Sequence, residues 1–114
     1  MSPDEFVLAD MLVAARKARE FVDGLSFEEF EASDLHQNAV VRALEVVGEA
    51  ARRVSDETRN AHPSIPWRPI IGMRNRLMHE YFRVDLEEVW RTVTTDIPQL
   101  VELLSPLVPP EDHS

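Results

Sequence analysis

The chain has 114 residues, of which 44% are hydrophobic and 29% charged, a size that fits one domain with its own core and is too short for two. It contains no cysteine, which excludes disulfides and thiolate metal sites, and no apolar run approaches the roughly 20 residues needed to cross a bilayer. The net charge is −9, and the N-terminus lacks the basic flank and apolar run of a signal peptide, so we expect a cytoplasmic protein without a membrane segment.

Apolar residues recur at spacings of three and four along most of the chain, and sustained alternation of period two is absent, which predicts an all-α fold. A first helix is expected to begin at Ser2, with Pro3 in its first turn and Glu5 completing a capping box, and to end near Gly24. Its predicted core stripe comprises Val7, Met11, Ala14, Ala18 and Phe21.

A short helical turn is predicted from Ser26 to Glu29, and a longer helix begins at Asp34 with Gln37 three residues later. The core stripe of this longer helix is Val40, Leu44, Val47, Ala51 and Val54. Gly48 lies inside the helix, where glycine costs roughly 1 kcal/mol relative to alanine, so we expect it to admit a closely packed neighbouring helix. The charged set of Glu45, Glu49, Arg52 and Arg53 is interpreted as an ordinary solvated helix face.

Residues 55–66 are polar with two prolines and are predicted to be a linker that enters a third helix at Trp67. Asp85 and Glu88 predict a capping box at the start of a last helix, which Pro98 should kink. The core positions expected in these two helices are Trp67, Ile70, Ile71 and Met78, then Leu86, Val89, Trp90, Val93, Ile97, Leu100, Val101 and Leu104.

These elements predict an antiparallel bundle of four main helices plus short helical turns. The helical domain should span residues 1–105. Residues 106–114, which include Pro109-Pro110 and two acidic residues, are expected to form a frayed tail.

The segment from Arg74 to Tyr81 concentrates the chemistry of the chain. It contains a fixed cation at Arg74, an amide at Asn75, a proton shuttle at His79 and a phenol at Tyr81. Residues 52–91 carry a net charge of +2, whereas residues 1–51 carry −7 and residues 92–114 carry −4. Eleven of the twelve basic residues are arginine, which favours bidentate contacts with a few phosphates over a general polycationic surface. The acidic remainder either aids solubility or attracts a basic partner.

On a regular helix, Arg74 and Tyr81 share nearly the same azimuth, while Asn75 and His79 lie four residues apart on an adjoining strip. Arg74 and His79 are about 140° apart, so one isolated helix does not point both tips at one phosphate without distortion. A second copy of the chain would remove this difficulty.

The spacing Arg-x4-His-x-Tyr, with Asn directly after the Arg, resembles the signature of the HEPN superfamily, and in particular its HepT-like toxins. The likeness covers roughly residues 5–104. It includes Ala43–Ala51, His62–Trp67, Ile70–Met73, Tyr81-Phe82, Val84-Asp85, Val89-Trp90 and Asp96–Pro98. The resemblance implies the toxin of a type VII toxin-antitoxin module, an endoribonuclease that acts as a homodimer and cleaves RNA without metal through attack of the ribose 2'-hydroxyl.

The resemblance also implies residue roles. Arg74, His79 and Asn75 would be catalytic, and Tyr81 would accept AMP from a partner minimal nucleotidyltransferase antitoxin; no cofactor is implied. The competing structural roles are a salt bridge for Arg74, a helix C-cap for His79 and ring packing at a helix end for Tyr81.

Two other functions stay open. One is a non-catalytic helical subunit that binds nucleotide or substrate for a separate nucleotidyltransferase, and the other is a structural dimerisation module. A metal site is not expected, because His36, His62 and His113 lack ligand spacing and Arg83 stands where a zinc-binding helix that begins at His79-Glu80 needs its second histidine. Trp67 and Trp90 are expected in the core.

Overall fold

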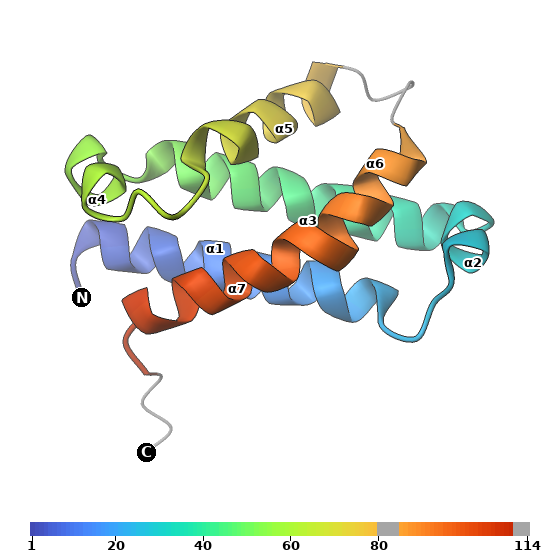
Figure 1. Ribbon diagram of the computed structural model, residues 1–114, viewed down its shortest axis with the longest axis horizontal. Coiled ribbons are helices and arrows are strands. Elements are labelled where there is room, and N and C mark those ends of the chain that lie inside the picture. Colours follow the sequence, from blue (N-terminus) through green and yellow to red (C-terminus); the bar gives the residue numbers. More distant parts are fainter. Residues whose placement is uncertain (80–84, 111–114) are drawn as a thin grey trace.

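The computed structural model describes residues 1–79 and 85–110, with the side chains of Met78 and His79 outside the described part. Within these ranges every regular element is helical. Four main segments run antiparallel to their neighbours, which confirms the predicted all-α bundle (Figure 1). They are α1 (Pro3–Val22), α3 (Asp34–Arg53), α5 (Trp67–His79) and a last segment made of α6 (Leu86–Arg91), η2 (Thr92–Asp96) and α7 (Ile97–Leu104).

Three short elements complete the described chain: α2 (Phe27–Glu31), α4 (Asp56–Ala61) and η3 (Ser105–Leu107). Helix α2 confirms the predicted turn. Helix α4 corrects the prediction of an irregular linker over residues 55–66, because Ser55 caps it by accepting the Thr58 N–H at 3.2 Å. None of its residues is buried, so it leaves no apolar period in the sequence.

Serine caps fix the starts of the early helices. The hydroxyls of Ser2 and Ser26 accept the backbone N–H groups of Glu5 and Glu29, whose carboxylates reach back to the serine N–H groups. The capping box predicted at Ser2 is therefore confirmed, and Ser26 forms a second one. Helix α3 is capped by Ser33, which corrects the expectation that Asp34 and Gln37 start it.

The predicted box at the start of the last segment is half confirmed. Asp85 accepts the N–H groups of Glu87 and Glu88 at 3.0 and 3.3 Å. The Glu88 side chain is paired with Arg76 of α5 and does not return to the cap. Glu88 therefore joins two helices.

The core lies between the four main segments. The predicted α3 stripe of Val40, Leu44, Val47, Ala51 and Val54 is buried throughout. On α1, Val22 is buried while Phe21 is 37% exposed, so the prediction that Phe21 faces the core is wrong. Phe21 and Val22 lie three and four residues after Ala18, so both fit helical periodicity. In the structure Val22 is the one that faces the core.

In α5, Trp67, Ile70 and Leu77 are buried and Ile71 packs half-buried against the core, while the side chain of Met78 lies outside the described part. Trp67 donates from Nε1 to the carbonyl oxygen of His62 at 3.1 Å. Trp90, the other tryptophan, packs on Phe27 and Phe30 with ring centroids 6.0 and 5.3 Å apart. Trp67 is therefore buried in the core, as predicted, whereas Trp90 packs against the core and is only partly buried.

The last segment changes its hydrogen-bond spacing just before the predicted kink at Pro98. Residues Thr92–Asp96 form a π-helical turn, and the N–H of Ile97 bonds to the carbonyl oxygen of Thr92. Proline has no N–H, so Pro98 has no bond to offer the preceding turn. In the same turn Thr94 donates its hydroxyl to the Trp90 carbonyl oxygen at 2.7 Å. The last segment is therefore irregular just ahead of Pro98, and a kink at Pro98 itself stays a prediction.

Beyond α7, Leu107 and Val108 pack partly buried against the core, so the first residues of the predicted tail touch the bundle. Residues 111–114 lie outside the described part, and fraying there stays a prediction.

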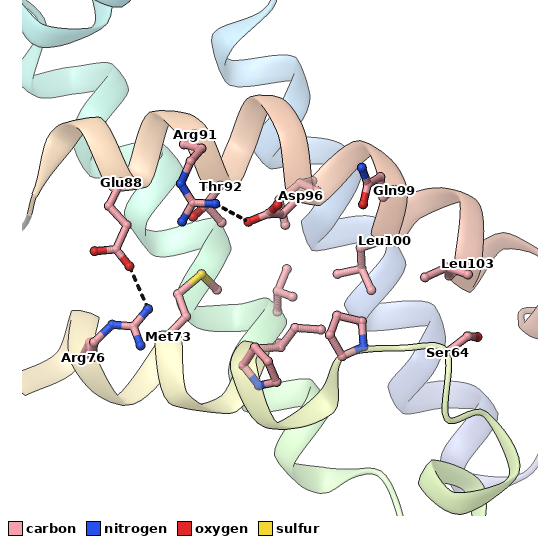
Figure 2. Close-up of a pocket in the computed structure, with 15 residues that line it drawn as sticks. Ser64, Met73, Arg76, Glu88, Arg91, Thr92, Asp96, Gln99, Leu100 and Leu103 are labelled. Atoms are coloured by element: carbon pink, nitrogen blue, oxygen red, sulfur yellow. Dashed lines mark hydrogen bonds and ion pairs between the residues drawn. The ribbon is translucent and has the colours of Figure 1, made fainter.

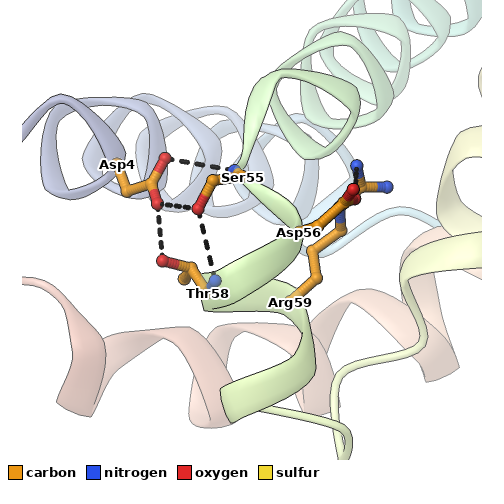
Figure 3. Close-up of polar contacts among 5 residues, drawn as sticks. All are labelled: Asp4, Ser55, Asp56, Thr58 and Arg59. Atoms are coloured by element: carbon orange, nitrogen blue, oxygen red, sulfur yellow. Dashed lines mark hydrogen bonds and ion pairs between the residues drawn. The ribbon is translucent and has the colours of Figure 1, made fainter.

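Asp4 ties the start of α1 to α4 (Figure 3). Its carboxylate accepts the backbone N–H of Ser55 at 3.2 Å and the hydroxyls of Ser55 and Thr58 at 2.5 Å each. The hydrogen bonds from the Ser55 and Thr58 side chains lower the pKa of Asp4 below its ordinary value of 3.8. Two segments about fifty residues apart in sequence are thereby held together.

The molecule is flattened, with extents of 41, 34 and 19 Å. Helix α3 packs between α1 and α5, and the last segment crosses this layer, with α7 against α1 (Figure 1). No helix in residues 1–79 and 85–110 is long and apolar enough to span a bilayer.

Candidate active site

Arg74 lies where α5 comes closest to α3. A Cβ placed on Gly48 of α3 would overlap the Cβ of Arg74, and it would lie 2.8 Å from the Arg74 Cγ and 3.2 Å from the Ile70 carbonyl oxygen. Real Cβ atoms essentially never approach another heavy atom to less than 3.0 Å. Gly48 is therefore needed for the approach of a neighbouring helix, as predicted, and that neighbour carries Arg74.

The Arg74 guanidinium is held at both terminal nitrogens. Nη2 lies 3.0 Å from Oε2 of Glu49, and Nη1 donates to Oδ1 of Asn75 at 3.2 Å. The Arg74 side chain is 21% exposed, so it is neither buried in the core nor loose in solvent. The salt bridge anticipated as a structural role for Arg74 is present, and it leaves part of the group open to the surface.

Glu49 connects two arginines. Its Oε1 accepts from Arg52 at 3.0 Å on the same helix, while Oε2 faces Arg74 on the neighbouring one. The hydrogen bond from Arg52 and the positive charges of Arg52, Arg74 and Arg53 lower the pKa of Glu49, against a smaller opposing effect of burial. The interpretation of Glu49 as part of an ordinary solvated face is wrong, because its partner in α5 could not be inferred from spacing within one helix.

Arg74 also lines the margin of an open groove between α1 and α3, which we call the α1/α3 groove. Its volume is about 720 Å³. Apolar side chains on its surface include Val13 and Phe21, which are 46% and 37% exposed. Charges of both signs surround them, from Asp10, Lys17, Arg42, Glu45, Glu49, Arg53 and Arg74. The groove offers both apolar and ionic contacts beside the Arg74 guanidinium.

Arg76 points to a different surface from Arg74. Its Nη2 pairs with Oε1 of Glu88 at 2.8 Å across the gap between α5 and α6. This pair borders a second pocket of about 380 Å³ between α5 and the last segment, where Arg91 pairs with Asp96 at 3.3 Å (Figure 2). We call it the interhelical pocket. Arg74 and Arg76 thus serve separate surfaces of α5.

The structure brings together only part of the predicted site. Arg74 and Asn75 are in contact, and the backbone of His79 forms the last residue of α5. The side chain of His79 and the whole of Tyr81 lie outside the described part. Their roles therefore stay predictions.

The remaining histidines with described structure have local roles. His36 Nδ1 shares a hydrogen bond with the Ser33 hydroxyl at 2.6 Å, and His62 follows α4 as its C-cap. Among the residues described, no group of three or more His, Cys, Asp or Glu side chains is arranged to hold a metal ion.

Comparison with known proteins identifies the family. A family model described as Ribonuclease HepT-like matches residues 11–107, a range that contains Arg74, Asn75, His79 and Tyr81. The chain belongs to the HepT-like ribonuclease family. The resemblance drawn from the Arg-x4-His-x-Tyr spacing is thereby confirmed.

Named relatives agree with this assignment. The HepT-like chain is 42% identical over 93 residues to "Probable ribonuclease HepT" of Thermococcus cleftensis, covering 82% of this chain and 84% of the relative. It is 37% identical over 93 residues to "Putative RNase MJ1380" of Methanocaldococcus jannaschii, covering 82% and 85%. It is 43% identical over 81 residues to "Putative RNase TTE0752" of Caldanaerobacter subterraneus subsp. tengcongensis, covering 71% and 72%. No solved structure matches the HepT-like chain at a significant level.

Proposed function

We propose that this protein is the toxin of a type VII toxin-antitoxin module, a metal-independent endoribonuclease. The observation that carries the proposal is the state of Arg74, which is held by Glu49 and Asn75 at the margin of the α1/α3 groove and lies within the range matched by a ribonuclease family. An arginine held in this way can meet a phosphate without first being ordered.

In the proposed reaction the ribose 2'-oxygen attacks the adjacent phosphorus and the bond to the 5'-oxygen breaks. The 2'-hydroxyl loses its proton to a base and the leaving 5'-oxygen receives one from an acid, which yields a 2',3'-cyclic phosphate and a 5'-hydroxyl end. His79 moves a proton as base or acid. Arg74 binds the phosphate and stabilises the charge that grows on it, and Asn75 orients the Arg74 guanidinium or the His79 ring.

A homodimer is part of the proposal. Arg74 and His79 diverge by about 140° on a regular helix, so two copies of α5 would supply the two groups to one phosphate more easily than one copy does. The α1/α3 groove supports a second copy as the occupant, because it has exposed apolar side chains and a rim of both charge signs. A two-fold interface needs such self-complementarity.

Tyr81 is proposed as the acceptor of AMP from a minimal nucleotidyltransferase antitoxin. The phenol oxygen attacks the α-phosphorus of ATP, pyrophosphate leaves, and the phenol proton passes to solvent or to a base of the transferase. The added anionic group would occupy the cationic site that RNA phosphate needs. We expect both proteins to act in the cytoplasm, where RNA and ATP are available.

The alternative is a non-catalytic subunit that binds a nucleotide or substrate for a separate nucleotidyltransferase. The interhelical pocket favours it, because its volume of about 380 Å³ lies within the range of small-ligand sites and Arg76 and Arg91 stand at its edge. Each of these arginines is already paired with a carboxylate. Arg74 is paired in the same way with Glu49, so this does not decide between the two. The family match and the names of the relatives favour a ribonuclease, and we prefer that proposal.

The chemistry of the product ends tests the proposal. Purified protein is incubated with single-stranded RNA in the presence of a metal chelator, and the ends of the fragments are determined. Fragments with 2',3'-cyclic phosphate and 5'-hydroxyl ends are expected. Cleavage that requires a divalent metal and leaves 5'-phosphate ends would contradict the mechanism, whereas nucleotide binding without any cleavage would favour the alternative.

A further inference from the structure

We propose that Glu49 is a positioning residue for the reaction, acting through Arg74. The inference rests on the proposed ribonuclease function, and it adds that the carboxylate on α3 sets the direction of the guanidinium and balances its charge until RNA arrives. It comes from the contact between the two helices, since spacing within α3 alone explains Glu49 through Arg52.

Two contacts restrain the Arg74 guanidinium. A guanidinium has five N–H donors in a rigid planar fork. Nη1 donates one hydrogen bond to Asn75, whereas Oε2 of Glu49 lies 3.0 Å from Nη2 as an ion pair that does not meet the geometry of a hydrogen bond. The other donors of the fork remain for phosphate oxygens at the groove margin.

Glu49 is itself held in place. Arg52 occupies Oε1 at 3.0 Å while Arg74 faces Oε2 at the same distance, so each carboxylate oxygen serves one arginine. Because Arg52 lies three residues along the same helix, it fixes the Glu49 rotamer without help from α5. The carboxylate is then a fixed reference point for the arginine of the neighbouring helix.

Gly48 and Glu49 act as a pair of neighbours. Gly48 lets the backbone of α3 approach the Cβ of Arg74, and Glu49, the next residue, meets the other end of the same side chain. Close packing therefore restrains Arg74 at its Cβ, and an ion pair restrains it at the guanidinium. A group fixed before the substrate binds loses little freedom when the transition state forms.

The variant Glu49→Gln tests this role, because glutamine keeps the shape and one acceptor oxygen but removes the charge. We expect kcat to fall about tenfold or more, since small misplacements of a reacting group have effects of this size. We also expect KM for RNA to fall, because the Arg74 charge is no longer balanced in the free protein. A fully 2'-O-methylated oligonucleotide, which lacks the attacking hydroxyl, should bind several-fold more tightly to this variant.

Two further variants serve as comparisons. Glu102→Gln removes a carboxylate from an exposed position of α7 and should behave like the unmodified protein. Glu49→Asp retains the charge on a shorter stem, and it should recover part of the lost kcat and restore KM. If Glu49→Gln does not fold, the kcat and KM of Glu49→Asp still test the role of Glu49.

The possible outcomes distinguish a failure of the role proposed for Glu49 from a failure of the proposed ribonuclease function. If the unmodified protein does not cleave RNA, the proposed function fails. If it cleaves RNA and Arg74→Ala is inactive, but Glu49→Gln matches Glu102→Gln in kcat, KM and oligonucleotide binding, then the role of Glu49 is refuted and the ribonuclease proposal stands. A lower kcat with unchanged KM and unchanged oligonucleotide binding would also refute the inference, since removal of a carboxylate that balances the Arg74 charge has to change the affinity for RNA.

Discussion

The backbone of Gly48 in α3 lies against the Cβ of Arg74 in α5, in space that any side chain on residue 48 would occupy. Two helices are thus joined at the position where the chain carries its candidate phosphate-binding group. This contact affects both the packing of the two helices and the position of Arg74. Its loss can therefore be measured through stability and through RNA cleavage.

Replacing Gly48 with alanine should destabilise the fold. The added methyl group would overlap the Arg74 side chain and crowd the Ile70 carbonyl oxygen, and overpacking of this kind costs about 1–3 kcal/mol. The free energy of unfolding from urea denaturation measures the change. Gly72→Ala is the matched control, because the nearest described atom to its new methyl group is the flexible Arg76 Nη1 at 4.0 Å. That variant should gain up to about 1 kcal/mol from helix propensity.

Asp4→Asn should make the fold less stable at neutral pH but not in acid. Because the folded-state pKa of Asp4 is below its ordinary value of 3.8, its carboxylate contributes stability above that value, and the contribution is lost as the pH falls through the folded-state pKa. The difference in Tm between wild type and Asp4→Asn should be clear at pH 7 and disappear near about pH 2. A difference that grows in acid would contradict the account.

The α1/α3 groove is expected to bury Val13 in the proposed homodimer. Val13→Glu would place a charge in that contact, and burying an unpaired charge strongly disfavours association. Light scattering or analytical ultracentrifugation should give twice the chain mass of 13.1 kDa for wild type and the single mass for the variant. Leu35→Glu adds the same charge at an exposed leucine outside the groove and should leave the dimer intact. Dissociation by both variants, or by neither, would place the interface elsewhere.

Incubation with the proposed nucleotidyltransferase partner and ATP should add the mass of AMP to the protein, as measured by intact-mass spectrometry. Tyr81→Phe removes the only phenol in the chain and should abolish the gain. Loss of RNA cleavage should accompany the gain in mass, because the added group is anionic and lies close in sequence to Arg74. A gain that persists in Tyr81→Phe would assign the modification to another residue.

The fold was largely predictable because its signals are local. Helical periodicity located the four main segments, and the reciprocal serine and glutamate caps at Ser2 and Ser26 fixed the starts of α1 and of the short helix α2. The errors arose where a local rule allowed two answers. Ser33 and Asp34 are adjacent cap candidates, and Phe21 and Val22 both continue the stripe of α1. Helix α4 buries no residue and so gave no apolar signal.

The candidate site was only partly predictable for the same reason. Arg74 and Asn75 are neighbours in sequence, and their contact lies within one helix. Glu49 was missed because its second partner comes from a helix that begins eighteen residues later, while Arg52 explained it locally. The signal available was its position directly after Gly48, since a residue beside a close helix contact can reach the neighbouring helix.

RNA cleavage is proposed to depend on both Arg74 and His79. The rate at which purified variants cleave single-stranded RNA in the presence of a metal chelator tests this dependence. His79→Ala should lower the rate on the order of 10²- to 10⁴-fold and Arg74→Ala by about 10²- to 10³-fold, with circular dichroism unchanged. Arg68→Ala, an exposed arginine of the same helix, should retain the wild-type rate. Cleavage at the wild-type rate by both His79→Ala and Arg74→Ala would contradict the claim.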